Sequence, residues 1–260
     1  SSLSKTTIGP NYKKNLPEQN VLNWAPSVMF RYMFNKQHVL MFRYRGRSST
    51  PNIEDLQEVI DITDPMNLRY GNPNLKPSFN NNFTLDYRKF VPESMRSYSA
   101  NLYYTSTLNS VANRMTYDPQ TGARVYKKEN VNGNWQARGF FSFNTPLKNK
   151  KFTISSNTNA RFSDAVSYTS VGSSKNADQE LSTTHNLGLG ERFTSSYRSE
   201  VFDISLSGSV NYNLVRNSKQ ENSNRETFDY YIGGNTNVNL PWQVSISTDI
   251  NCRFKDGYTG

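Results

Sequence analysis

The sequence predicts an all-β chain whose antiparallel, up-and-down strands belong to a transmembrane β-barrel. The first observation is an alternation of apolar and polar residues along nearly all 260 positions, the pattern expected when successive side chains point to opposite faces. The second is the composition: only 35% of residues are hydrophobic, but 13% are aromatic. A chain this polar and this aromatic needs an architecture that spreads its apolar residues thinly. The third is a succession of short and long connections, which is typical of outer-membrane barrels.

Four alternating segments occupy the first half of the chain. In the second of them, Phe42 and Tyr44 alternate with Arg43 and Arg45. The apolar sets of the four segments are Val28, Phe30, Tyr32 and Phe34; Leu40, Phe42 and Tyr44; Phe83, Leu85 and Tyr87; and Tyr98, Ala100, Leu102 and Tyr104. The intervening positions are rich in Asn, Ser, Thr and Arg, so we expect one face to meet lipid and the other to line a wet lumen.

The second half of the chain continues this pattern. Its apolar sets are Trp135, Ala137, Gly139, Phe141 and Phe143; Phe152 and Ile154; Leu187 and Leu189; Phe202, Ile204, Leu206, Val210, Tyr212 and Leu214; Phe228, Tyr230, Ile232, Val238 and Leu240; and Val244, Ile246, Ile250, Cys252 and Phe254. The total is about ten strands, many of them longer than the usual five or six residues. We predict that six of these side chains face lipid: Phe30, Phe42, Phe83, Leu85, Phe141 and Phe254.

The connections separate a membrane barrel from a soluble sandwich, whose shorter strands would also alternate. Short connections fall at residues 35–37, 91–95, 147–151, 197–200 and near 241–242. Long polar ones fall at residues 49–78, 116–124, 170–178 and 217–225. Tight periplasmic turns and longer extracellular loops alternate in this way in outer-membrane barrels, which favours the membrane assignment.

We interpret residues 1–260 as a single barrel region. The first strand, from about residue 22, leads into a short turn, and an even number of strands returns the chain to the loop side. The chain is therefore expected to enter and to leave the sheet on the loop side, and the sheet is expected to have two unpaired edge strands. Such a sheet would be part of a larger wall, of the class with about 22 strands around a plugged lumen.

Catalysis and metal binding find little support. His185 falls in an apolar set and His38 follows a tight turn, so we expect interfacial or turn roles for both. The single Cys252 excludes an internal disulfide, and no nucleophile elbow, phosphate loop or EF-hand spacing occurs. We predict no catalytic residue, metal ligand or cofactor. The net charge of +9 is spread over many strands and turns, which fits membrane interfaces and predicts no nucleic-acid partner.

The densest basic row is the one formed by Arg43, Arg45 and Arg47 on one face of a single predicted strand. One interpretation is a solvated lumen wall. The other is a surface that attracts anionic ligands or pairs with acidic residues of a plug. We retain these three arginines as candidate lumen ligand-binding residues.

The long connection ends in the sequence YGNPNLKP at residues 70–77, followed by a strand that opens with NNF and reaches LDY. Its residues of interest are Gly71, Asn72, Pro73, Leu75, Lys76 and Pro77. Glycine, proline and asparagine are residues with which a loop turns sharply back into a strand, so we predict a structural role for this segment.

This segment, with Pro26 and Ser27 opening a strand and RGRSSTP closing the next one, resembles the barrel of TonB-dependent outer-membrane receptors. The resemblance is greatest to the outer-membrane barrel family common in Bacteroidetes-type bacteria; it is strong over about residues 23–90 and is that of a generic barrel beyond them. Ser78 stands where that family usually has an acidic residue. No plug, TonB box or closing aromatic strand is recognisable, so we expect this stretch to supply wall and loops only.

The resemblance implies a bacterial outer-membrane location and uptake of a scarce nutrient of the siderophore, glycan or peptide class. The implied partners are outer-membrane lipid and lipopolysaccharide, a plug domain with TonB in the full-length protein, and a surface lipoprotein. The alternative is a self-contained ten-stranded barrel that acts as an adhesin, a structural protein or an enzyme.

Overall fold

The computed structural model describes residues 24–57, 61, 63–147, 150–170, 179–240 and 244–257, and the backbone of four short strands before them. In that earlier part, β1 (Ser2–Leu3) pairs with β4 (Gln19–Asn20), and β2 (Thr6–Gly9) pairs with β3 (Tyr12–Asn15). Within the described residues, no helix is long and apolar enough to cross a membrane.

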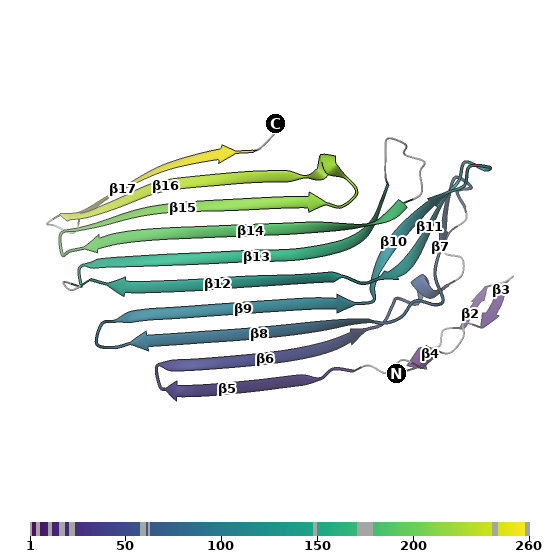
Figure 1. Ribbon diagram of the computed structural model, residues 1–260, viewed down its shortest axis with the longest axis horizontal. Coiled ribbons are helices and arrows are strands. Elements are labelled where there is room, and N and C mark those ends of the chain that lie inside the picture. Colours follow the sequence, from purple (N-terminus) through teal and green to yellow (C-terminus); the bar gives the residue numbers. More distant parts are fainter. Residues whose placement is uncertain are drawn as a thin grey trace.

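One antiparallel sheet of ten strands makes up most of the molecule (Figure 1). Neighbours in this sheet follow one another along the chain, apart from the three short strands described below, so the topology is up-and-down as predicted. The ten strands are β5 (Ser27–Asn35), β6 (His38–Ser49), β8 (Ser78–Val91), β9 (Arg96–Leu108), β12 (Asn134–Pro146), β13 (Phe152–Ser170), β14 (Gln179–Arg198), β15 (Phe202–Asn217), β16 (Arg225–Leu240) and β17 (Val244–Asp256).

The register of the sheet separates the side chains into two faces, because residues directly opposite one another on neighbouring strands share a face. The apolar face is defined by the row Phe30, Phe42, Leu85, Leu102, Gly139, Ala160, Leu189, Tyr212 and Phe228. The polar face is defined by the row Arg43, Thr84, Tyr103, Arg138, Arg161, Gly188, Asn213 and Thr227.

All six side chains predicted to face lipid lie on the apolar face, which confirms the alternation. This face is open: Leu206 is 61% exposed and Ile232 is 65% exposed. Figure 1 shows a single layer of strands over most of the length of the sheet. Large apolar side chains left uncovered in this way are the mark of a surface that meets lipid or another protein.

Aromatic rings gather near both ends of the apolar face. Near the short turns, the ring of Tyr197 lies 4.6 Å from that of Phe152 and 5.5 Å from that of Phe202. Toward the other end, the ring of Tyr104 lies 5.9 Å from Phe83 and 6.0 Å from Trp135. Two aromatic belts with an apolar band between them are typical of barrels in an outer membrane.

The connections at the two ends of the sheet differ. At one end of the strands, here called the turn end, residues 36–37, 92–95 and 199–201 make short connections, as predicted, and the predicted turn at 147–151 includes residues 148–149, which lie outside the described residues. The opposite end, the loop end, contains two short 3-10 helices and three strands: η1 (Glu54–Leu56), β7 (Asn67–Tyr70), β10 (Ser110–Tyr117), β11 (Arg124–Val131) and η2 (Glu221–Ser223). The predicted turn near residues 241–242 and most of the predicted loop at 170–178 lie outside the described residues.

A second sheet at the loop end adds three strands that the sequence analysis did not predict, in and around the long connections at residues 49–78 and 116–124. β10 and β11 form an antiparallel hairpin, of which the predicted loop at 116–124 is only the tip, and β7 pairs parallel to β11. The parallel pairing joins segments far apart in the chain, so local alternation gave no sign of it. The core also sits here, where the buried apolar side chains of the described residues are Leu56, Leu75, Met115, Ala123 and Val131.

The edges of the main sheet are β5 and β17, each with one neighbour in the sheet. Every residue of both strands is exposed. β5 begins and β17 ends at the loop end (Figure 1), as the direction argument predicted. The strand begins at Ser27 rather than near residue 22, a position that lies outside the described residues.

We predict that Leu206→Arg destabilises the protein by roughly 2–4 kcal/mol in a bilayer, because the charge enters the lipid-facing band. Ser205→Arg on the same strand places its charge on the polar face and should have little effect. The measurement is the free energy of folding into liposomes by urea titration. Equal destabilisation by the two variants would contradict the assignment of the faces.

Candidate functional site

The three arginines predicted to line the lumen lie on the polar face of β6. Arg43 stands opposite Thr84, and Arg45 stands opposite Asn82. Arg43, Arg45 and Arg47 are exposed, and none of them forms an ion pair with a described residue. The row is therefore free to attract an anionic group, as one of the two interpretations of the sequence proposed.

Two further arginines extend this basic region, and sequence reasoning missed them. Arg138 on β12 and Arg161 on β13 are directly opposite each other on the polar face. Like charges in this position destabilise a sheet, and neither arginine has an ion-pair partner among the described residues. Arg138 donates a hydrogen bond of 3.2 Å to Gln136 Oε1. The pair thus keeps two unneutralised charges on the lumen wall.

The YGNPNLKP segment forms a junction between the two sheets, which supports the structural role predicted for it. Gly71 is buried, and a Cβ there would lie 2.0 Å from the carbonyl oxygen of Gln57 and 2.6 Å from that of Asp55. Asn72 donates its backbone N–H to Asp55 O at 2.7 Å. Its side-chain amide donates to Lys128 O at 2.9 Å. Only glycine permits this close approach of two backbones.

The end of the segment is attached to β11 through Asn130. The backbone N–H of Lys76 donates to Asn130 Oδ1 at 2.7 Å, and Asn130 Nδ2 donates to Lys76 O at 3.0 Å. Leu75, the residue before Lys76, is only 3% exposed. The Asn130 side chain therefore pairs with the backbone of Lys76 as a neighbouring strand would, and it fixes the chain two residues before β8 begins. Pro73 and Pro77 complete the segment on either side of Leu75.

A polar cavity lies between η1 and the loop-end sheet. Its volume is about 290 Å³, and its walls include Tyr70, Tyr126, Arg69 and Asn113. An ion pair of 2.6 Å between Lys128 and Asp55 closes one side. Glu54 also lines the cavity, so the arrangement offers aromatic, cationic, carboxylate and amide groups to a polar ligand at the loop end.

The β10–β11 hairpin is attached to the last residues of β13, at the loop end, by a small charged cluster. The Tyr168 hydroxyl donates to Glu129 Oε2 at 2.6 Å, and Arg114 lies 3.3 Å from Glu129 Oε1. The Tyr168 hydrogen bond, with a further contribution from Arg114, lowers the pKa of Glu129 below its ordinary value. Burial and the same hydrogen bond raise the pKa of Tyr168.

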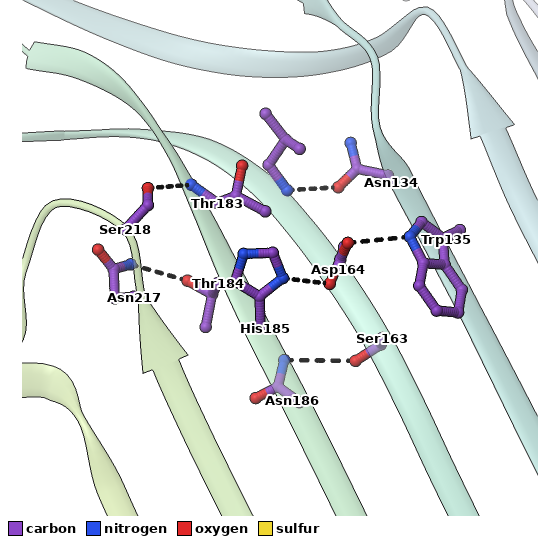
Figure 2. Close-up of polar contacts among 11 residues, drawn as sticks. Asn134, Trp135, Ser163, Asp164, Thr183, Thr184, His185, Asn186, Asn217 and Ser218 are labelled. Atoms are coloured by element: carbon purple, nitrogen blue, oxygen red, sulfur yellow. Dashed lines mark hydrogen bonds and ion pairs between the residues drawn. The ribbon is translucent and has the colours of Figure 1, made fainter.

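His185 lies on the apolar face, as predicted, but it belongs to a polar cluster that the sequence did not reveal (Figure 2). Its Nδ1 atom lies 2.6 Å from Asp164 Oδ1. Trp135 Nε1 donates to Asp164 Oδ2 at 3.0 Å. The three residues come from β14, β13 and β12, and their adjacency depends on the register between those strands. His38 stacks on Phe34 at 4.1 Å beside the first short turn, which confirms its predicted place.

Glu191 is a second exception on the apolar face, where it stands opposite Thr158 and Val210. Ser156 donates to its Oε1 atom at 2.7 Å, and Thr158 donates to its Oε2 atom at 2.5 Å. Both carboxylate oxygens thus have a partner, which reduces the cost of placing the group among apolar neighbours.

The described residues contain no group of three or more His, Cys, Asp or Glu side chains that could hold a metal ion. Cys252 is exposed on the apolar face of β17.

Comparison with known proteins gives one match. The model of the outer membrane protein beta-barrel family matches residues 4–194. No match was found among curated proteins or among solved structures.

We predict that Gly71→Ala disrupts the junction at a cost of about 1–3 kcal/mol, because the added methyl group has no space against two backbone carbonyls. Limited proteolysis should then cleave residues 50–77 faster, while the main sheet remains intact. Gly208→Ala is the matched control, since the nearest atom to its Cβ would be Tyr231 O at 3.8 Å. Equal protease resistance of the two variants would refute a tight junction.

The lowered pKa of Glu129 predicts a pH dependence of the β10–β11 hairpin. The contribution of Glu129 to stability is complete above the ordinary glutamate pKa of 4.5 and is lost as the pH falls through its lower pKa in the folded protein. Tyr168→Phe should shift this loss to higher pH, because it removes the main hydrogen bond. The measurement is hydrogen-exchange protection of the hairpin as a function of pH. Tyr126→Phe, on the same hairpin, should leave the profile unchanged; identical profiles for both variants and the natural protein would contradict the assignment.

Proposed function

Because the chain belongs to the outer membrane protein beta-barrel family and so lies in the bacterial outer membrane, we propose that it supplies part of the wall of a TonB-dependent transporter. The substrate would be a scarce nutrient of the siderophore, glycan or peptide class. In this proposal the apolar face meets lipid, the polar face lines the lumen, and the loop end faces the cell exterior, since long loops of such barrels are extracellular.

The observation that carries the proposal is the open main sheet. β5 and β17 each have one neighbour in the sheet, and all of their residues are exposed. Unpaired backbone groups are not tolerated in lipid, so further strands must cover these edges in the membrane. Ten strands would then be under half of a barrel of about 22 strands, the size class whose lumen holds a plug.

The charge of the polar face supports the same proposal. Arg43, Arg138 and Arg161 lie in one row of the sheet and have no ion-pair partner among the described residues. A plug with acidic residues, or an anionic ligand passing along the wall, would neutralise them. The polar cavity beside Tyr70 and Tyr126 would offer a first binding position at the cell surface.

The proposal carries the partners that the family resemblance implies. They are outer-membrane lipid and lipopolysaccharide around the wall, the plug domain and TonB on the periplasmic side, and a surface lipoprotein over the loop end. We propose no enzymatic role. The competing hypothesis, a self-contained ten-stranded adhesin, structural protein or enzyme, would require β5 to pair with β17.

Ion conductance of the intact protein, purified from outer membranes and inserted into planar bilayers, tests this proposal. A plugged large barrel should be closed in buffer and should conduct when mild urea loosens the plug, because the hydrogen-bonded wall resists urea longer. A closed ten-stranded barrel filled with side chains should remain silent under both conditions. Silence in urea would therefore overturn the transporter proposal.

The same recordings test the basic row. Replacing Arg138 and Arg161 together with glutamine should move the reversal potential in a salt gradient toward cation selectivity, because two lumen charges are lost. Lys36→Gln, in the first short turn, is the control and should leave the reversal potential in place. An unchanged potential in the double variant would contradict a lumen position for the pair.

A further inference from the structure

A pocket opens on the apolar face among β13, β14 and β15, and the transport proposal does not use it. Its volume is about 160 Å³. The lower walls are apolar and consist of Phe162, Leu187 and Leu214, one from each strand. The rim nearer the loop end consists of Asp164, His185, Arg216 and Trp135. An apolar floor under a charged rim matches a molecule with a lipid chain and a polar head.

The height of the pocket in the membrane follows from strand geometry. β14 reaches the turn end at Arg198, and His185 lies well above it on the same strand. A strand rises ~3.3 Å per residue and is tilted by about 40°, so His185 stands roughly 30–35 Å above the turn end. The apolar band of such a barrel is ~25 Å tall. The rim is therefore level with the headgroups of the outer leaflet, and the floor, two residues lower on β14, is level with the boundary between headgroups and acyl chains.

The acidic groups at and near the rim are engaged with partners other than Arg216, which is the cation of the rim. Both oxygens of Asp164 are engaged, one with His185 Nδ1 at 2.6 Å and the other with Trp135 Nε1 at 3.0 Å (Figure 2). Glu226, on the next strand, accepts the Tyr212 hydroxyl at 3.0 Å.

Arg216 stands directly opposite His185 and is exposed. It forms no ion pair with any residue in the described ranges. Since Asp164 holds the imidazole through Nδ1, the Nε2 atom of His185 is left for a second contact with a ligand. Two polar groups on adjacent strands thus flank the mouth of the pocket.

We propose that this pocket binds a single phosphorylated lipid of the outer leaflet. Its phosphate contacts the Arg216 guanidinium and His185 Nε2, and one acyl chain lies against Phe162, Leu187 and Leu214. Arginine suits phosphate because its planar fork can donate two parallel hydrogen bonds. The apolar floor selects a lipid rather than free phosphate, which has no chain to place there.

Trp135 lines the pocket and provides the probe. The intact protein, with its other tryptophans replaced by phenylalanine, is reconstituted in phosphatidylcholine vesicles that contain a minor fraction of brominated lipid. Brominated phosphatidate should quench Trp135 fluorescence with an association about fivefold stronger than brominated phosphatidylcholine at the same fraction, because only the former carries a phosphomonoester. Arg216→Gln should abolish this preference, and Arg216→Lys should retain part of it.

Arg225→Gln is the matched control, because Arg225 is exposed on the polar face of the neighbouring strand, opposite Val215. It should keep the full preference. An equal loss in the Arg225 and Arg216 variants would assign the effect to general surface charge and overturn the site. Equal quenching by both lipids in the natural protein would also overturn it. Competition by inorganic phosphate would show a soluble anion instead of a lipid, which contradicts the proposal.

Discussion

The ladder of backbone hydrogen bonds between neighbouring strands is the interaction on which the rest of this structure depends. Lipid offers no other partner to backbone N–H and C=O groups, so each strand must pair along its membrane-spanning length. The pairing of β13 with β14 runs unbroken from Phe152 opposite Tyr197 to Ser170 opposite Gln179. Because the side-chain period is two, a slip of one residue would carry Leu187 and Leu189 to the polar face and the arginines into lipid.

Most of the wall could be predicted from the sequence, because alternation is a local property of each strand. The ten strands, the assignment of Phe42 and Leu85 to one face and the position of the short turns follow from residues near in the chain. β7, β10 and β11 could not be found in this way, since the parallel pairing of β7 with β11 joins residues more than fifty positions apart. Arg138 and Arg161 show the same limit: each is visible alone in the sequence, but their positions opposite each other depend on the register between β12 and β13.

The departures from alternation are more informative than the rule. Asp164 and Glu191 both lie on the apolar face, and in both the carboxylate oxygens have hydrogen-bond partners from adjacent strands. On the polar face, by contrast, Arg43, Arg138 and Arg161 have no carboxylate partner among the described residues. These two carboxylates are therefore satisfied by hydrogen bonds although their neighbours on the face are apolar, whereas the three arginines keep their charge where water, a plug or a ligand can reach it. Ionisable groups at membrane depth are rare enough to be treated as functional by default.

The unequal strand lengths give the wall an uneven height. β5 has 9 residues, whereas β14 has 20. At about 2.6 Å of height per tilted residue, β14 rises on the order of 50 Å and β5 on the order of 25 Å, close to the thickness of the apolar band. The β13–β14 hairpin thus projects beyond the membrane as the tallest part of this sheet. A bacteriophage or an antibody that approaches this part of the cell surface meets that projection before it reaches the lipid, so sequence change there alters recognition from outside without disturbing the wall below.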